Sequence, residues 1–327
     1  MFEGGTERPR QYHETVPNRI VLAWPRGYCA GVERAVDTVE RALRIYGPPV
    51  YVRKQIVHNI YVVRDLEAKG AVFVEDERQA PEGAVLILSA HGVAPEVYEN
   101  SARRRLSVID ATCPLVTKVH FEARRFARDG YTILLIGHEG HEEVIGTSGE
   151  APRHVRLVRS PEEARTIEVS DPDHVAYLSQ TTLSVDETNE VIEVLKERFP
   201  RIEGPPRDDI CYATQNRQEA VKQLASESDV VLVIGSDNSS NSKRLVEVAR
   251  SLGTPAYLID DETEIRSEWL EGRETVGVTS GASAPEWLVE RVVEDLKARG
   301  ATDVCQLHTV DEQMHFSLPV GIREPVA

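Results

Sequence analysis

Val230-Val-Leu-Val-Ile-Gly-Ser-Asp-Asn-Ser-Ser-Asn241 joins five aliphatic residues to a run of small polar residues. The same order recurs in Ala84-Val-Leu-Ile-Leu-Ser-Ala-His-Gly92 and in Tyr131-Thr-Ile-Leu-Leu-Ile-Gly-His-Glu-Gly-His141. Continuous aliphatic runs are typical of strands that are buried on both faces, as in parallel sheets covered by helices. Their recurrence predicts three small α/β units. Polar groups would gather at the carboxyl ends of the strands, where open α/β sheets bind ligands.

A second strand-like segment recurs in each unit, at residues 50–59, 175–182 and 275–283, and each copy ends in His, Thr or Ser. Amphipathic helix patterns, with apolar residues three and four apart, cover residues 32–43, 116–127 and 217–224. We therefore predict an α/β fold of three pseudo-repeated units with mainly parallel sheets. The expected boundaries are 30–113, 114–210 and 211–312. The strand within residues 18–29 would join the third sheet, and residues 313–327 would form an extended C-terminal arm.

One cysteine stands at the strand-to-helix corner of each unit: Cys29, Cys113 and Cys211, here called the cysteine triad. Three thiolates cannot pair off as disulfides, but they can hold an iron–sulfur cluster and leave one iron open for chemistry. Zinc is the rival metal, although structural zinc sites usually use close pairs such as Cys-x2-Cys, and none is present. Cys305 lies outside the repeated setting. We expect it to be structural, with a role as fourth ligand as the alternative.

Composition limits the class of partner. The net charge of −16 gives no broad footprint for nucleic acid or for anionic lipid. No apolar run approaches the roughly 20 residues that span a bilayer. The polar lead-in, residues 1–18, does not resemble a secretory signal. Four cysteines in 327 residues are too few for a disulfide scaffold and fit a reducing, cytoplasmic compartment.

The polar residues at the predicted strand ends are mostly neutral hydrogen-bond donors. They are His58, His91, His138, His141, Thr181, Thr182, Ser239, Ser240, Asn241 and Ser283. Such donors, together with backbone N–H groups at helix N-termini, can hold phosphate. The serine run also fits a helix N-cap, which needs only one such residue. The phosphate loop, the dinucleotide fingerprint and the nucleophile elbow of serine hydrolases are all missing.

His138-Glu-Gly-His141 has only a superficial likeness to a zinc protease motif, because that motif needs histidines at i and i+4 on a helix. Here the spacing is i, i+3, and a glycine interrupts the helix. The carboxylates Glu142 and Glu143 follow this motif directly. A carboxylic acid near a bound substrate could donate protons, and a solvated loop charge is the alternative.

Several motifs in combination carry a resemblance to a known family. They include Arg-Gly-Tyr-Cys-Ala-Gly-Val, Ile-Val-His-Asn, Ser-Ala-His-Gly-Val, Asp-Ala-Thr-Cys-Pro, Gly-His-Glu-Gly-His, Ser-Gln-Thr-Thr-Leu-Ser, Ile-Cys-Tyr-Ala-Thr-Gln-Asn-Arg-Gln, Asn-Ser-Ser-Asn-Ser and Gly-Ala-Ser-Ala-Pro-Glu. From about Arg19 to Pro319 the chain resembles the 4-hydroxy-3-methylbut-2-enyl diphosphate reductases. This family performs the last step of the methylerythritol phosphate route to isoprenoids.

The resemblance implies a trefoil of the three units around a [4Fe–4S] cluster that Cys29, Cys113 and Cys211 ligate, with the substrate hydroxyl on the fourth iron. It implies isopentenyl and dimethylallyl diphosphate as products and an external one-electron donor protein such as ferredoxin or flavodoxin. Glu143 would donate the proton, with Thr181 near the hydroxyl end. The implied diphosphate-binding residues are His58, His91, His141, Ser239, Ser240, Asn241 and Ser283.

Two other functions compete with this one. A non-enzymatic iron–sulfur electron carrier or redox sensor usually has four cysteine ligands and needs no substrate pocket. The triad and the polar cluster argue against it. A structural zinc protein is the other alternative, and the absence of close cysteine pairs argues against that.

Overall fold

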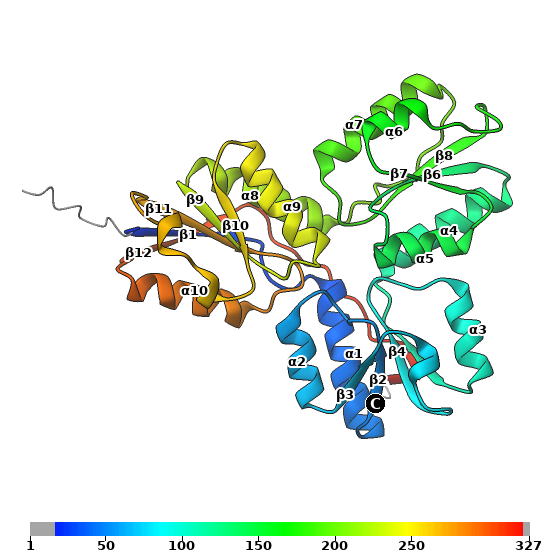
Figure 1. Ribbon diagram of the computed structural model, residues 1–327, viewed down its shortest axis with the longest axis horizontal. Coiled ribbons are helices and arrows are strands. Elements are labelled where there is room, and N and C mark those ends of the chain that lie inside the picture. The colour runs from blue at the N-terminus through cyan, green and yellow to red at the C-terminus, as the bar shows by residue number, and fades with distance from the viewer. Residues whose placement is uncertain (1–16, 323–327) are drawn as a thin grey trace, which may run out of the picture.

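The computed structural model describes residues 17–322. The first sixteen residues of the polar lead-in and the last five of the predicted arm lie outside that range. Figure 1 shows three lobes, each built on its own sheet with helices packed around it. The sheets have four, three and five strands, and every strand pairing between named strands of the described chain is parallel. The predicted α/β class with parallel sheets is confirmed.

The first lobe holds the four-stranded sheet, in the order β3-β2-β4-β5. Its strands are β2 (Val50–Arg53), β3 (Ala71–Val74), β4 (Val85–Leu88) and β5 (Ser107–Asp110). Its helices are α1 (Ala30–Tyr46), α2 (Ile60–Ala68), α3 (Pro95–Arg103) and the short 3-10 turn η1 (Glu77–Gln79).

The second lobe has the smallest sheet, in the order β7-β6-β8. Its strands are β6 (Thr132–Ile136), β7 (Val155–Val158) and β8 (Val175–Ser179). Its helices are α4 (Pro114–Arg128), α5 (Glu142–Glu150), α6 (Pro161–Thr166) and α7 (Val185–Arg198).

The third lobe has five strands in the order β10-β9-β11-β1-β12. They are β1 (Arg19–Trp24), β9 (Val230–Ile234), β10 (Ala256–Ile259), β11 (Thr275–Ser280) and β12 (Asp303–His308). The helices are α8 (Tyr212–Ser226), α9 (Ser240–Ser251) and α10 (Glu286–Ala298), with the 3-10 turns η2 (Glu262–Glu264) and η3 (Ser267–Trp269). The first strand of the chain therefore lies in the last sheet, between β11 and β12.

The aliphatic runs form strands that are covered on both faces. In β9 all five residues are buried, and alternate side chains enter two separate cores. Val230, Leu232 and Ile234 pack with α10, whereas Val231 and Val233 pack with α8 and α9. Each such side chain contributes about 2 kcal/mol by burial, so a polar residue has no acceptable face on this strand.

The segment after β12 returns to the first lobe (Figure 1). Ser317 accepts a hydrogen bond from Arg34 on α1, with an Nε–O distance of 2.8 Å. The 3-10 turn η4 (Val320–Ile322) then buries Ile322 completely in the core of the first lobe. The described part of the predicted arm thus crosses from the third lobe to the first and is anchored there.

We propose the sequence-based boundaries 30–113, 114–210 and 211–312 as the three units, because each sheet falls within one range apart from β1. No helix within residues 17–322 is both long enough and apolar enough to span a membrane.

Candidate active site

The cysteine triad occupies three equivalent positions in the structure. Cys29, Cys113 and Cys211 are the N-cap residues of α1, α4 and α8. Each backbone N–H donates to a carbonyl just beyond the carboxyl end of a strand. The acceptors are Ala282 at 3.3 Å after β11, Ala90 at 2.9 Å after β4, and Thr181 at 3.1 Å after β8. The repeat in sequence therefore corresponds to a repeated hydrogen bond, and it brings three helix N-termini to one cavity.

One cavity between the lobes is lined by the whole triad. Gly31, in the first turn of α1, also faces it. A Cβ added to this glycine would lie 2.7 Å from the Cys113 sulfur and 3.8 Å from the Cys29 sulfur. No three His, Cys, Asp or Glu side chains within residues 17–322 are grouped closely enough to hold a single metal ion. The three sulfurs nevertheless open onto one shared cavity.

The thiols of the triad lie in a protected environment. Burial, followed by the nearby Cys29 sulfur, raises the pKa of the Cys113 thiol to about 12. The same two causes raise the pKa of Cys211 to about 11. Holding these sulfurs as thiolates at neutral pH requires a positively charged group among them, as a cluster of iron ions would provide.

Three histidines, here called the histidine trio, form one wall of the cavity: His58 after β2, His91 after β4 and His141 after β6. The rings of His58 and His91 stack with centroids 4.0 Å apart. The ring of His141 stands edge-on to both, at 5.7 and 6.0 Å.

Two members of the trio are half-buried, and their pKa values are lowered. Burial, helped by the neighbouring His141, lowers the pKa of His58 to about 4. Burial also lowers the pKa of His91 well below its usual value. The Nδ1 atoms of both rings are buried without a hydrogen-bond partner among the described residues. An unsatisfied buried polar atom costs about 1–3 kcal/mol, so these atoms mark a place where a polar ligand would bind.

A second part of the cavity lining is the N-terminus of α9. Ser239 is the N-cap and accepts from the backbone N–H of Ser242 at 3.3 Å. Ser240 and Asn241 follow in the first turn, and all three residues Ser239 to Asn241 line the cavity. The Asn241 Oδ1 atom accepts from the Ala282 N–H at 2.9 Å, which ties the helix to β11. A helix N-terminus with hydroxyl and amide side chains is a suitable anion site.

A buried carboxyl group completes the lining. Glu143 is 5% exposed and lies in the first turn of α5, beside the triad cysteine Cys211 and the threonines that follow β8. Its Oε2 atom accepts from both the N–H and the hydroxyl of Thr181, each at 2.9 Å. Thr181 also supplies the carbonyl that accepts from Cys211, so one residue connects the carboxyl group to the triad.

Most of the site residues expected from the sequence share this cavity. The members that line it are Cys29, His58, His91, Cys113, His141, Glu143, Thr181, Cys211, Ser239, Ser240 and Asn241. Ser283 lies just behind the wall, where its hydroxyl donates to the His58 carbonyl at 2.9 Å. Cys305 is on β12, where its thiol lies 3.7 Å from the Ile20 carbonyl of β1, and it is not part of the lining.

Two contributors were not anticipated. The hydroxyl of Thr214 lies 3.2 Å from the Cys211 sulfur and accepts from Asn241 at 3.4 Å. Gln180 accepts from the backbone of His138 and donates to Thr182 and Ser240, so it connects the second and third lobes. The position of Thr214, three residues after Cys211, places it one helical turn away, and that spacing could have identified it.

The family model described as LytB protein matches residues 20–297. The chain belongs to the LytB family. Among LytB relatives, the 4-hydroxy-3-methylbut-2-enyl diphosphate reductase of Acidothermus cellulolyticus is 63% identical over 306 residues, which are 93% of this chain and 90% of that protein. The reductase numbered 2 of Mycobacterium tuberculosis strain H37Rv is 60% identical over 94% of this chain and 93% of its own.

Two solved structures share the fold of this chain. The E-1-hydroxy-2-methyl-but-2-enyl-4-diphosphate reductase of Plasmodium falciparum superposes with a TM-score of 0.91 at 37% identity, over 94% of this chain and 97% of that one. A second structure, titled as (E)-4-hydroxy-3-methyl-but-2-enyl diphosphate reductase, the terminal enzyme of the non-mevalonate pathway, gives a TM-score of 0.62 at 34% identity. It covers 87% of this chain and 100% of that one. The family resemblance expected from the motifs is confirmed.

Proposed function

We propose that this chain reduces (E)-4-hydroxy-3-methylbut-2-enyl diphosphate to isopentenyl and dimethylallyl diphosphate in the methylerythritol phosphate pathway. One observation carries the proposal: a single cavity joins three cysteine thiols, a wall of neutral phosphate donors and a buried carboxyl group. The names of the relatives, at about 60% identity across nearly the whole chain, support the same substrate. An electron carrier or redox sensor would have no use for the histidine and serine walls.

The triad is proposed to hold a [4Fe–4S] cluster. The three sulfurs come from equivalent helix N-termini, and the absent side chain of Gly31 leaves space beside two of them. When bound, such a cluster would relay electrons one at a time from an external donor to the substrate and would offer a Lewis-acidic iron. The protein positions the substrate, excludes water and delivers protons.

The diphosphate is proposed to bind between the histidine trio and the N-terminus of α9. The orphaned Nδ1 atoms of His58 and His91 would gain partners there, and the helix terminus would offer backbone N–H groups. Ser283 is proposed to contribute from behind, because its hydrogen bond holds the backbone of His58. No Lys or Arg of the described chain lines the cavity, so neutral side chains and backbone N–H groups would have to hold the diphosphate.

Glu143 is proposed to donate a proton to the departing hydroxyl. Thr181 holds Oε2 through two hydrogen bonds, which fixes the carboxyl plane and assigns Oε1 as the oxygen that carries the proton. In the balanced reaction one allylic alcohol, two electrons and two protons give one product molecule and one water. The C–O bond breaks, the hydroxyl leaves as water, and the second proton is added to carbon.

Each turnover consumes two electrons, which the chain must regain from an external reductant. We propose a one-electron donor protein such as ferredoxin or flavodoxin, and a cytoplasmic location where such donors occur.

The test is anaerobic turnover of the reconstituted protein with a reduced one-electron dye and the hydroxy-allylic diphosphate, with both products quantified by chromatography. We expect both products from the parent chain and severe loss of turnover in Glu143→Gln with its iron content kept. Substrate left unreduced by a fully reconstituted sample would overturn the proposal.

A further inference from the structure

The start of α5 carries three consecutive polar residues that face different parts of the molecule. His141, the N-cap, joins the histidine trio, and Glu143 bonds Thr181. Glu142, between them, belongs to neither wall of the cavity. Its side chain is 19% exposed and extends from the second lobe toward the first.

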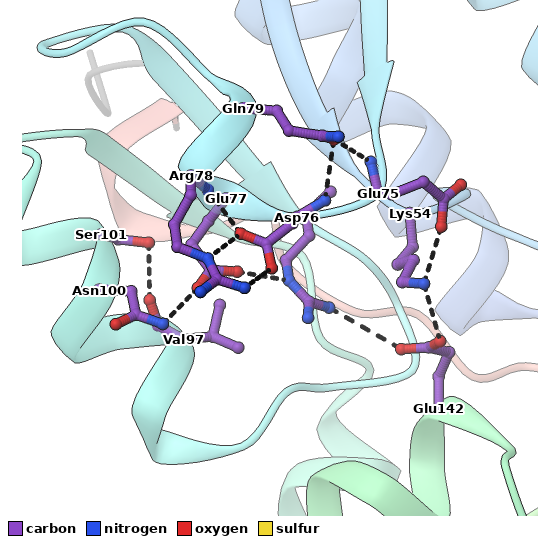
Figure 2. Close-up of polar contacts among 11 residues, drawn as sticks. Lys54, Glu75, Asp76, Glu77, Arg78, Gln79, Val97, Asn100, Ser101 and Glu142 are labelled. Carbon is purple, nitrogen blue, oxygen red and sulfur yellow. Dashed lines mark hydrogen bonds and ion pairs between the residues drawn. The ribbon is translucent and has the colours of Figure 1, made fainter.

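Glu142 meets two cations at the end of β2. Its Oε2 atom lies 3.8 Å from Nη1 of Arg53, and its Oε1 atom lies 3.8 Å from Nζ of Lys54. Figure 2 shows Glu142 at the first turn of α5, with Lys54 projecting toward it from the first lobe. Both cations are largely sheltered, with 15% and 32% of their side chains exposed, so water screens these pairs less than fully exposed ones.

The guanidinium that Glu142 meets is fixed within the first lobe. Arg53 donates from Nε to Glu77 at 2.9 Å, and Glu77 is 1% exposed. The second oxygen of Glu77 accepts from Asn100 on α3 at 2.6 Å. Because Glu77 holds the Nε side of the Arg53 guanidinium, its Nη1 atom stays directed toward Glu142.

The ammonium group is fixed by a second set of contacts. Lys54 donates to Glu75 at 2.8 Å. The backbone N–H groups of Glu75 and Asp76 both donate to Gln79, which stabilises the η1 turn, as Figure 2 shows. Lys54 has a φ of +57°, a left-handed conformation unusual for a residue other than glycine. Strained backbone of this kind persists only where the surrounding structure demands it.

We propose that Glu142 is a positioning residue that ties the first turn of α5 to the first lobe. The tie matters because the histidine trio is shared between lobes: two members belong to the first and His141 to the second. The far end of α5 is also held, since a Cβ on Gly149 would lie 2.3 Å from the Ala94 side chain. Glu142 thus holds the N-terminal end of α5, which carries His141 and Glu143, while close packing fixes the C-terminal end.

The inference rests on the proposed roles of His141 and Glu143 and goes beyond them. Loosening the tie moves both residues relative to His58 and His91. Diphosphate affinity and proton delivery should therefore weaken together, while the triad, held by other contacts, keeps its cluster.

The test compares Glu142→Gln with Glu162→Gln, a matched control. Glu162 lies on α6 of the same lobe, is 77% exposed and pairs only locally with Arg165. We expect Glu142→Gln to keep its iron content and melting temperature. It should lower kcat/KM about tenfold, with a lower kcat and weaker binding of inorganic diphosphate. Glu162→Gln should match the parent in every measurement.

A charge exchange separates positioning from general damage. Glu142→Lys should have a lower kcat/KM than Glu142→Gln, because it places a third cation beside Arg53 and Lys54. Adding Lys54→Glu to Glu142→Lys should raise kcat/KM at least threefold above that of Glu142→Lys alone, since the charges at positions 54 and 142 are again opposite. No recovery in the double variant, or parent kinetics in Glu142→Gln, would overturn the tie.

The two proposals fail in different ways. If Glu142→Gln has the kinetics of the parent while Glu143→Gln is inactive, only the positioning role of Glu142 is wrong. Full turnover in Glu143→Gln would remove the proton donor itself.

Discussion

Replacing Gly31 with alanine adds one methyl group where two sulfurs of the triad meet. The new Cβ would lie 2.7 Å from the Cys113 sulfur and 3.4 Å from the Cys113 Cβ. The sulfur would have to retreat by about 0.7 Å to reach an ordinary contact of 3.4 Å. Overpacking of this kind costs about 1–3 kcal/mol where the neighbour cannot move.

The cost depends on whether iron is bound. In the cluster-free protein the thiol is the mobile end of a short side chain and can rotate away. Alanine also favours a helix over glycine by up to about 1 kcal/mol. With a cluster bound, the sulfur is fixed and cannot move. We therefore expect the unfolding free energy of the cluster-free chain to change little, while cluster binding weakens by about 2 kcal/mol, or about thirtyfold.

The assay is iron and sulfide content per chain after anaerobic reconstitution at limiting iron, with urea unfolding of the cluster-free protein alongside. Gly321→Ala is the control, because its added Cβ would meet nothing within 4 Å. Low iron with parent-like urea unfolding in Gly31→Ala is the expected result. Parent iron content at limiting iron would refute the placement of the cluster beside α1.

Three further results are expected. Serine in place of any one member of the triad should abolish turnover and cut iron content severely. Cys305→Ser is the control and should retain both. If a triad variant keeps its iron and its turnover, the replaced cysteine is not a cluster ligand. Glu143→Gln should keep the cluster and lower kcat at least a hundredfold, measured under saturating substrate; a near-normal kcat would exclude it as donor. Because burial lowers the pKa of His58 to about 4, its ring is neutral at pH 7.5. We expect a bound diphosphate to raise that pKa past 7.5, so that binding takes up protons and affinity falls as the pH rises from the free to the bound pKa. Calorimetry of inorganic diphosphate at pH 7.5 in two buffers should show proton uptake that His58→Asn diminishes. Equal uptake in both proteins would contradict this.

The strands were predictable because their chemistry is local. Five aliphatic residues in a row, such as Val230 to Ile234, have no stable place except between two layers of helices. The polar residues beyond each strand were predictable for a related reason, since the carboxyl ends of parallel strands gather at one edge. Their convergence from three lobes needed the repeat, which the cysteines supplied.

Contacts between lobes could not be predicted in the same way. The pairing of Glu142 with Arg53 joins residues 89 positions apart in the chain, and no local pattern marks either one. Gln180, which reaches Ser240 of the third lobe, is similar, because an isolated amide carries no periodicity. The burial of Ile322 in the first lobe was also hidden, since a proline-containing tail without periodicity reveals neither its direction nor its anchor.

The most direct test of the central claim is a Mössbauer spectrum of the anaerobically reconstituted protein, recorded with and without (E)-4-hydroxy-3-methylbut-2-enyl diphosphate, together with iron and sulfide counts. We expect a [4Fe–4S] spectrum in which the substrate changes the signal of one iron and leaves three unchanged. A cluster whose four irons are all indifferent to the substrate, or a protein that binds zinc and no iron, would contradict it.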